Sequence, residues 1–315
     1  MRRAAFRLAA RVLLVCALLV LPSPFGSSEE APSPFRRGAA RPRPILNVAH
    51  AGASSLAPQN TIAAGRLALE LGADVWGIDV RATSDGVLVL MHDETLERTT
   101  DVEERFPNRA PWRVDEFTLD EIRTLDAGSW FLEEDPFAQI AEGAVSAELA
   151  ASYAGEPVPT LREALEFVAE AGWLIDVEIK PPAEGERRAV AERVVRLIAE
   201  TGTVDRVLVS SFDHAFLREV RAIDPTIPIG ALAIFPPLGG LDDLLALGAD
   251  VYLPSIVALT DALLADLEEA GIHVIAWTYN APDQLRRAAG FRGVDGIYTD
   301  FPQRLAEILE DEASP

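Results

Sequence analysis

Two histidines and one carboxylate in the N-terminal part of the chain have residue types and spacing suited to acid–base chemistry. His50 and His92 each follow an apolar run of strand character, and Asp79 lies between them in the sequence. Imidazole titrates near neutral pH, so it can both accept and donate a proton. We expect each histidine at the carboxyl end of a strand, where parallel α/β sheets and barrels hold their reactive groups.

The dipeptide Asp85-Gly86 predicts how the second histidine meets the carboxylate. Two segments rich in β-forming residues flank it, and Asp-Gly between such segments is a hairpin signal. With Asp85-Gly86 as a two-residue turn, counting back along both strands places Asp79 opposite His92, about 5 Å apart at Cβ. A surface hairpin with incidental polar residues is the alternative.

The motifs around these residues resemble those of the glycerophosphodiester phosphodiesterase family, whose pattern is His-Arg-Gly, Pro-Glu-Asn-Thr, Glu-x-Asp and His-Asp. The matching segments are His50-Ala-Gly, Pro58-Gln-Asn-Thr61, Gly77-Ile-Asp79 and His92-Asp93. The resemblance continues at Glu178-Ile-Lys180, Ser210-Ser-Phe212, Trp277-Thr-Tyr-Asn280 and Asp295-Gly-Ile-Tyr-Thr-Asp300-Phe-Pro302. It covers nearly all of residues 45–311, and the joint order of the motifs is far more specific than any one of them.

This resemblance implies roles for the site residues. His50 and His92 would be the general acid–base pair of phosphodiester cleavage. A hard divalent cation, Ca²⁺ or Mg²⁺, would neutralise charge on the phosphoryl oxygens. Asp79 and Glu178 match the metal ligands of the family, and Lys180 matches its phosphate-contacting lysine.

Two further residues are candidates for substrate contact. Arg81 lies two residues beyond Asp79, on the same face of its strand, and could supply a second cation. A solvated hairpin residue is the alternative for Arg81. Trp277 ends a strand and is expected to line the pocket, as in the family, with a core tryptophan as the alternative.

Three departures from the family pattern fall inside the expected site. Gly77 stands where the first glutamate of Glu-x-Asp belongs, Ala51 replaces an arginine that would clamp the phosphate, and Gln59 replaces a glutamate. Asp176 shares a strand face with Glu178 and could contribute a ligand, or it could belong to the core. The reduced carboxylate set predicts weak metal binding and a need for high Ca²⁺ or Mg²⁺, which Gly77→Glu should relieve if the space is free.

From residue 45 onward, strand-like and helix-like segments alternate. A helix-like run follows each of eight strand-like runs, at 45–49, 75–80, 174–179, 206–210, 227–232, 250–253, 273–277 and 296–299. Eight βα pairs are the number that a closed (β/α)₈ TIM barrel requires, so the predicted fold class is α/β. Residues 81–158 form a long insertion after the second strand, expected over the active-site end.

The remaining segments predict export. Residues 1–28 combine a basic start, a short apolar run and a Pro/Ser/Gly stretch, as a secretory signal peptide does; an uncleaved anchor is the alternative. Residues 29–44 predict a disordered linker, 45–311 the phosphodiesterase barrel and 312–315 a tail. We therefore expect a secreted or periplasmic protein without a stable membrane anchor after signal cleavage.

Composition limits the classes of partner. The 315 residues, 49% of them hydrophobic, suit one large domain. A formal net charge of −22 disfavours nucleic acid and anionic membranes, and it requires a local cation for any phosphate-bearing substrate. Cys16 is the only cysteine, so no intrachain disulfide is possible.

The leading functional hypothesis is hydrolysis of glycerophosphodiesters, small-molecule substrates, to glycerol 3-phosphate and an alcohol. One alternative is a phospholipase D-like lyase on the same barrel, acting on a lipid that keeps its acyl chains. That activity would favour an apolar loop at the mouth, and the sequence indicates none beyond Trp130–Leu132. The other alternative, motivated by the three departures, is a catalytically weakened ligand-binding barrel.

Overall fold

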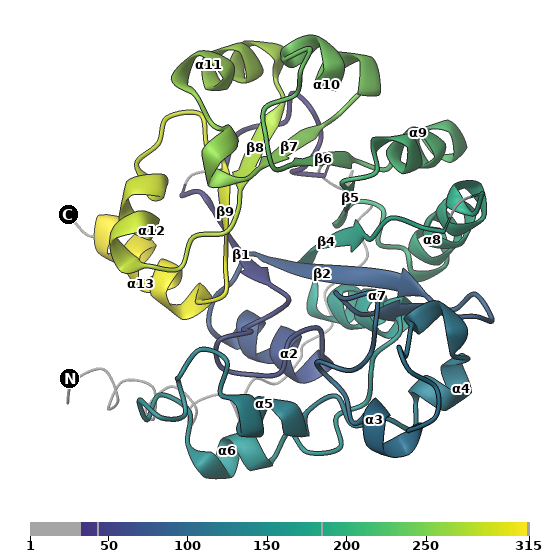
Figure 1. Ribbon diagram of the computed structural model, residues 1–315. Coiled ribbons are helices and arrows are strands. Elements are labelled where there is room, and N and C mark those ends of the chain that lie inside the picture. Colours follow the sequence, from purple (N-terminus) through teal and green to yellow (C-terminus); the bar gives the residue numbers. More distant parts are fainter. Residues whose placement is uncertain (1–32, 43, 184, 314–315) are drawn as a thin grey trace, which may run out of the picture.

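Eight parallel strands close into a barrel in the computed structural model, which describes residues 33–42, 44–183 and 185–313 (Figure 1). Strand β1 pairs with both β2 and β9, which joins the two ends of the sheet and confirms the predicted (β/α)₈ barrel. The barrel strands are β1 (Leu46–His50), β2 (Val75–Ala82), β4 (Leu174–Ile179), β5 (Val207–Ser211), β6 (Ile229–Ala233), β7 (Val251–Pro254), β8 (His273–Ala276) and β9 (Gly296–Thr299).

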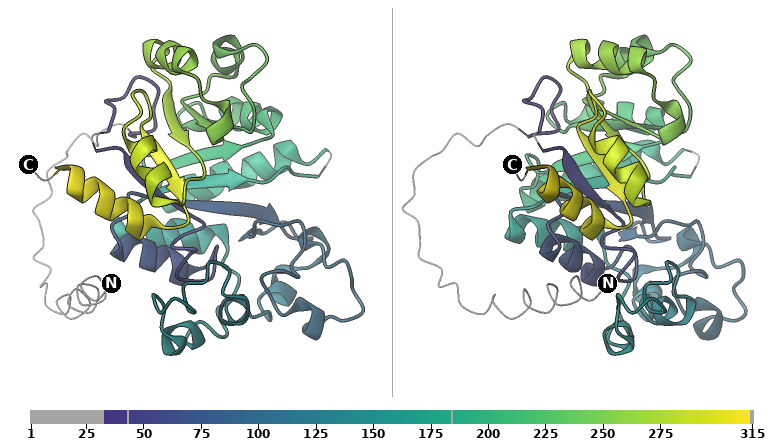
Figure 2. Two further views of the ribbon diagram at one scale, coloured as in Figure 1. Left: turned by 60° about the vertical axis from the view of Figure 1, so that its left-hand side comes forward. Right: turned by 90° about the vertical axis from the view of Figure 1, so that its left-hand side faces the viewer.

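A helix follows each barrel strand and packs on the outside of the ring (Figures 1 and 2). Local signals set the ends of these helices: in α7, Thr160 and Glu163 form a capping box, and Gly172 ends the helix at φ 65°. The helices are α2 (Ile62–Glu70), α7 (Leu161–Ala171), α8 (Arg187–Thr201), α9 (His214–Ile223), α10 (Leu241–Leu247), α11 (Asp261–Ala270), α12 (Pro282–Ala289) and α13 (Pro302–Ala313).

The insertion after β2 folds beside the barrel mouth. Figures 1 and 2 show it on the side of β2 and α2, so it flanks the active-site end instead of covering it. Its first part has a small core of its own, and its second part packs on Leu56 and Ala57 of the loop after β1. It contains β3 (Leu88–Leu90), α3 (Val102–Arg105), the 3₁₀ turn η1 (Val114–Glu116), α4 (Leu119–Ile122), α5 (Ser129–Glu134) and α6 (Ala147–Ala151).

The β2–β3 hairpin exists, but its predicted register is wrong by one residue. The backbone N–H of Thr83 donates to the carbonyl of Val87, so three residues form the loop, with Gly86 at φ 81°. A three-residue loop with glycine in the left-handed region is the next most common hairpin after the two-residue turn. Asp79 therefore lies opposite Met91, whose N–H donates to the Asp79 carbonyl, and not opposite His92.

The predicted disordered linker, 29–44, is wrong for residues 33–42, which pack against the amino-terminal end of the barrel. Phe35 is buried among inward-facing strand residues such as Val48 and Leu208. Arg41 forms an ion pair with Asp295. One aromatic side chain in a polar segment carries too little sequence signal to reveal this contact.

Among the described residues, no helix is both long and apolar enough to cross a bilayer. The predicted signal peptide, residues 1–28, lies outside the residues that the structure describes.

Replacing Phe35 by alanine should destabilise the fold without changing the mouth of the barrel. Truncating a fully buried phenylalanine costs about 3–5 kcal/mol, because apolar contacts are lost and a cavity remains. Thermal unfolding followed by circular dichroism measures this loss. Phe235→Ala removes the same atoms from a side chain that is 72% exposed, so it should leave Tm unchanged. Equal Tm values for both variants would contradict the packing of Phe35.

Candidate functional site

His50 ends β1 and is held by an acidic side chain from the far end of the chain. Its Nδ1 lies 2.7 Å from Oδ1 of Asp300, which directly follows β9. Ser54 and Asn280 donate to the two oxygens of that carboxylate at 3.1 and 2.6 Å. This network fixes the ring so that Nε2 is the nitrogen left for a reactant.

The surroundings of His50 favour its protonated form. Burial lowers the pKa of the imidazole, but the hydrogen bond and charge of Asp300 raise it, and so do the charges of Asp79 and Glu178. The opposing effects leave the pKa of His50 above its usual value. The same contacts hold the pKa of the Asp300 carboxyl below its usual range, although burial raises it. The pair is therefore suited to delivering a proton near neutral pH.

His92 reaches the same mouth on the other side of β2. Strand β3 ends at Leu90, and the chain then bends so that His92 lies close enough to Asp79 for its charge to lower the pKa of that carboxyl. Nδ1 of His92 is 2.6 Å from Oδ1 of Asp93, and 45% of the His92 side chain is exposed. The Nε of Arg81 donates to the His92 carbonyl at 3.1 Å, which anchors this end of the hairpin.

Asp79 is positioned by Asn60, which lies in the turn before α2. Thr61 caps α2 by accepting from Ala64, and Asn60 instead turns to the carboxylate. The Asn60 Nδ2 donates to Asp79 Oδ2 at 2.8 Å, and its Oδ1 accepts from the Asp79 backbone N–H at 3.0 Å. Asn60 adopts φ 57°, a conformation that asparagine tolerates better than most residues.

Lys180 connects the two predicted metal ligands. Strands β2 and β4 pair in register so that Asp79 lies beside Glu178. The ammonium of Lys180 lies 2.7 Å from Asp79 Oδ1 and 2.6 Å from Glu178 Oε1. Burial lowers the pKa of Lys180, but the two carboxylates outweigh it and raise that pKa. Burial raises the pKa of Asp79, yet Lys180 and the histidines bring it well below its usual range.

The position of the missing glutamate is filled from another strand. A Cβ atom placed on Gly77 would lie 2.5 Å from the ring of Tyr298 on β9. The Tyr298 hydroxyl donates to the carboxylate of Asp176, which lies beside Gly77 on β4. Burial raises the pKa of Asp176 to about 7, so at neutral pH this carboxyl is only partly ionised. The space that Gly77→Glu requires is therefore not free, because a side chain at position 77 would clash with Tyr298.

These residues do not fit the divalent ion that the family resemblance implies. Among the described residues, no three His, Cys, Asp or Glu side chains are grouped so that they could hold a metal ion together. Asp79 and Glu178 already share the ammonium of Lys180, and Asp176 is engaged with Tyr298. The donors that remain for a metal ion are the carboxylates of Asp79 and Glu178, and both already bind the ammonium of Lys180.

Trp277 directly follows β8 and forms part of an apolar wall at the mouth. Its indole N–H donates to the Leu253 carbonyl at 2.8 Å, and its ring meets Phe212 edge to face at 5.7 Å. Beside this wall, large apolar side chains are exposed on the loops after β5, β6 and β7. They are Phe212, Ile234, Phe235, Leu238, Ile256 and Val257. Apart from Phe212, which lies in a matching motif, the sequence did not single them out, because no periodicity marks a loop.

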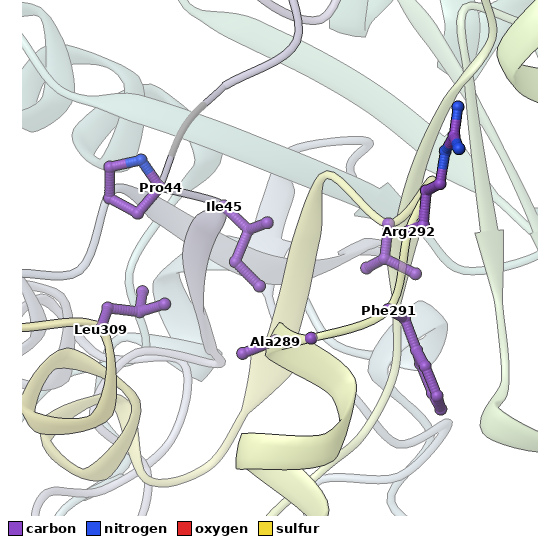
Figure 3. Close-up of a pocket in the computed structure, with 8 residues that line it drawn as sticks. Pro44, Ile45, Ala289, Phe291, Arg292 and Leu309 are labelled. Atoms are coloured by element: carbon purple, nitrogen blue, oxygen red, sulfur yellow. The ribbon is translucent and has the colours of Figure 1, made fainter. Parts of the chain in front are cut away.

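A further hollow lies at the opposite end of the barrel. It has a volume of about 270 Å³ and is lined by Pro44, Ile45 and the loop that precedes β9 (Figure 3). Pro44 and Ile45 precede β1, so this hollow opens at the amino ends of the strands, remote from His50 and His92. Its lining is mostly apolar, and we assign it no part in the chemistry.

Sequence reasoning found the histidines, Asp79, Glu178 and Lys180, and these side chains converge at one mouth. Asp300 and Asn280 also lie within the matching motifs, but the sequence indicated no role for either of them. The available signal was that Asp300 directly follows β9 and Asn280 lies in the loop after β8, at the carboxyl ends of strands, where reactive groups gather.

Comparisons with known proteins point in one direction. The family model described as the glycerophosphoryl diester phosphodiesterase family matches residues 50–304. The glycerophosphodiester phosphodiesterases of Caldanaerobacter subterraneus subsp. tengcongensis and Bacillus altitudinis are 34% and 32% identical, and each match covers 84% of this chain and 97% of the relative. A phosphodiesterase of Oleispira antarctica, solved with the product sn-glycerol-3-phosphate, is similar with TM-score 0.70 and 27% identity over 84% of this chain and 96% of its own. The glycerophosphodiester phosphodiesterase of Agrobacterium tumefaciens gives TM-score 0.62 and 26% identity over 82% and 98%.

Proposed function

Because the chain belongs to the glycerophosphoryl diester phosphodiesterase family, we propose that it hydrolyses a glycerophosphodiester to glycerol 3-phosphate and an alcohol. It is thus an enzyme of the phosphoric diester hydrolase class. The observation that carries the proposal is the pair of histidines, His50 held by Asp300 and His92 held by Asp93, around the Asp79–Lys180–Glu178 cluster.

The proposed reaction has two steps. The glycerol hydroxyl next to the phosphate attacks phosphorus while His92 takes its proton, and a cyclic phosphate forms. The bond to the departing alcohol breaks in the same step, and protonated His50 gives its proton to the leaving oxygen. Water then opens the cyclic phosphate with the roles of the two histidines reversed, so that one water is consumed per diester.

Arg81 and Trp277 are proposed as substrate contacts. Arg81 brings a second positive charge beside His92, and Trp277 with Phe212 offers an apolar wall to the alcohol group. The sequence of residues 1–28 supports export, so we propose a secreted or periplasmic enzyme.

An assay with sn-glycero-3-phosphocholine tests the proposed function. We expect equimolar glycerol 3-phosphate and choline, with phosphorus NMR showing any cyclic phosphate that accumulates. Release of glycerol and phosphocholine would place the cleavage on the wrong side of phosphorus. Saturable binding of the diester without turnover would favour the ligand-binding barrel instead.

A second substrate class is supported by the apolar rim, which we define as Phe212, Ile234, Phe235, Leu238, Ile256 and Val257. These side chains lie on the loops after β5, β6 and β7, at the end of the barrel that holds the histidines, and large exposed apolar groups gathered on neighbouring loops usually mark an interaction site. A lysophospholipid could place its glycerophosphodiester in the mouth and its acyl chain along the rim. The phospholipase D-like lyase is this candidate with cyclic phosphate as its final product.

Replacing both Phe235 and Leu238 by serine should weaken only the lipid reaction. Each fully buried side chain of this kind contributes about 1.5–3 kcal/mol, so we expect KM for monomeric lysophosphatidylcholine to rise about 10- to 100-fold. The KM for glycerophosphocholine should not change, since that substrate has no acyl chain. Leu149→Ser removes an exposed leucine from α6 and serves as the control. Equal effects on both substrates would remove the rim from substrate binding.

A further inference from the structure

Lys180 is the only lysine among the 28 basic residues of the sequence. It is also the buried cation between Asp79 and Glu178. Every other basic side chain in the chain is arginine, so a general preference for lysine does not explain this position. A role that requires an ammonium explains why a lysine stands at this position.

An ammonium can fill a place that a guanidinium cannot. It is a compact point charge with three donors, whereas guanidinium is a planar fork that binds one carboxylate through two nitrogens. Two donors of Lys180 are directed to Asp79 and Glu178. The third remains for an oxygen of a substrate phosphate. In size, charge and contacts, the Lys180 nitrogen resembles a bound cation.

The surrounding residues leave a divalent ion few donors. The space of a carboxylate at Gly77 is taken by the ring of Tyr298, which is itself fixed by its bond to Asp176. An ion placed between Asp79 and Glu178 would have to displace a buried ammonium from both of its partners. Leaving that ammonium buried and unpaired is costly.

We propose that Lys180 is the built-in cation of this site, occupying the place of a divalent ion between Asp79 and Glu178, so that turnover does not require a metal. The neutralising role for the phosphoryl oxygens rests on the proposed function. The exclusion of the ion from this place does not rest on the proposed function, because it follows from the packing alone.

Manganese binding tests the exclusion without any substrate. We titrate the full chain, Lys180→Gln and Arg81→Gln with Mn²⁺ by isothermal calorimetry. Wild type should show no saturable site up to about 1 mM. Lys180→Gln should gain one site, binding at least about 10-fold tighter than wild type, because two carboxylates lose their cation. Arg81→Gln removes a neighbouring positive charge without opening the place, so it should behave as wild type.

Saturable one-to-one binding by wild type that Lys180→Gln does not tighten would overturn the proposal. If Lys180→Gln does not fold, wild type labelled with ¹³C-lysine decides. Its single lysine ε-carbon signal should stay in place when Mg²⁺ or Ca²⁺ is added, and a saturable shift would contradict the proposal.

Chelation tests the second part of the proposal, that turnover does not require a metal. After exhaustive dialysis against EDTA, wild type should keep turning over glycerophosphocholine within a factor of about two, and Lys180→Gln should be about 10²- to 10³-fold slower. Loss of wild-type turnover that Mg²⁺ or Ca²⁺ restores would establish the metal site on Asp79 and Glu178 that the sequence predicts. No turnover under any condition would instead refute the proposed function, and the Mn²⁺ titration would still decide the exclusion.

Discussion

Alanine in place of His50 or His92 will lower kcat for glycerophosphocholine by about 10²- to 10⁴-fold, the usual contribution of a general acid or base. The reason is geometric: both rings lie at one mouth, each with Nδ1 bound to a carboxylate, which leaves Nε2 for the reacting oxygens. Neither ring is part of the apolar core, so both variants should fold. Initial rates and thermal unfolding measure the two effects.

His214→Ala is the matched control for these variants. That histidine opens α9, and its Nε2 is 3.0 Å from the Leu232 carbonyl, so it has a structural partner and no place among the reactive groups. Its kcat should remain close to that of wild type. Folded His50 and His92 variants that both keep more than half of the activity would exclude the two rings as the acid–base pair.

Asp300→Asn will reduce turnover by about 10²- to 10⁴-fold through His50, because a neutral amide neither fixes the correct tautomer nor stabilises the imidazolium. The pKa of His50 is raised because Asp300 and the other nearby carboxylates outweigh burial. Without the Asp300 charge, burial has more weight and the pKa falls. A catalytic acid must be protonated, so the alkaline limb of the kcat/KM profile should move to lower pH.

The pH profile separates positioning from simple loss of structure. Misfolding lowers the rate at every pH and leaves the limb in place, whereas loss of Asp300 displaces it. Asp283→Asn alters an exposed carboxylate in the first turn of α12 and should change neither rate nor profile. An unshifted limb in a folded Asp300→Asn would show that His50 is not the acid.

The barrel was predictable because its strands carry a strong local signal. Runs such as Leu174–Ile179 are rich in apolar and β-branched residues and are bounded by helical segments, and the structure places β4 at those same residues. Single-residue choices were not predictable in this way. Asp85-Gly86 is compatible with a loop of two or three residues, and local sequence does not decide between them.

Part of the site was predictable because strand ends gather reactive groups, and part was not because it depends on contacts across the barrel. Local pattern identifies His50 and Asp79, and the resemblance of Glu178-Ile-Lys180 to the family motif identifies Lys180. It cannot reveal that Tyr298, more than 200 residues beyond Gly77, fills the space left by an absent side chain. Because of that contact, the position where the family has a metal ligand is filled by the ring of Tyr298.

The contacts of residues 33–42 determine when this segment can dock on the barrel during synthesis. The Arg37 N–H donates to Asp250 and the Gly38 N–H to Gly271, while Arg41 pairs with Asp295. The ribosome therefore releases this segment long before Asp250, Gly271 and Asp295 are made. Phe35 can enter the barrel interior only after β7, β8 and the turn into β9 have been made. A chain that stalls earlier keeps an open apolar end, so the first part of the described chain to emerge is among the last to dock.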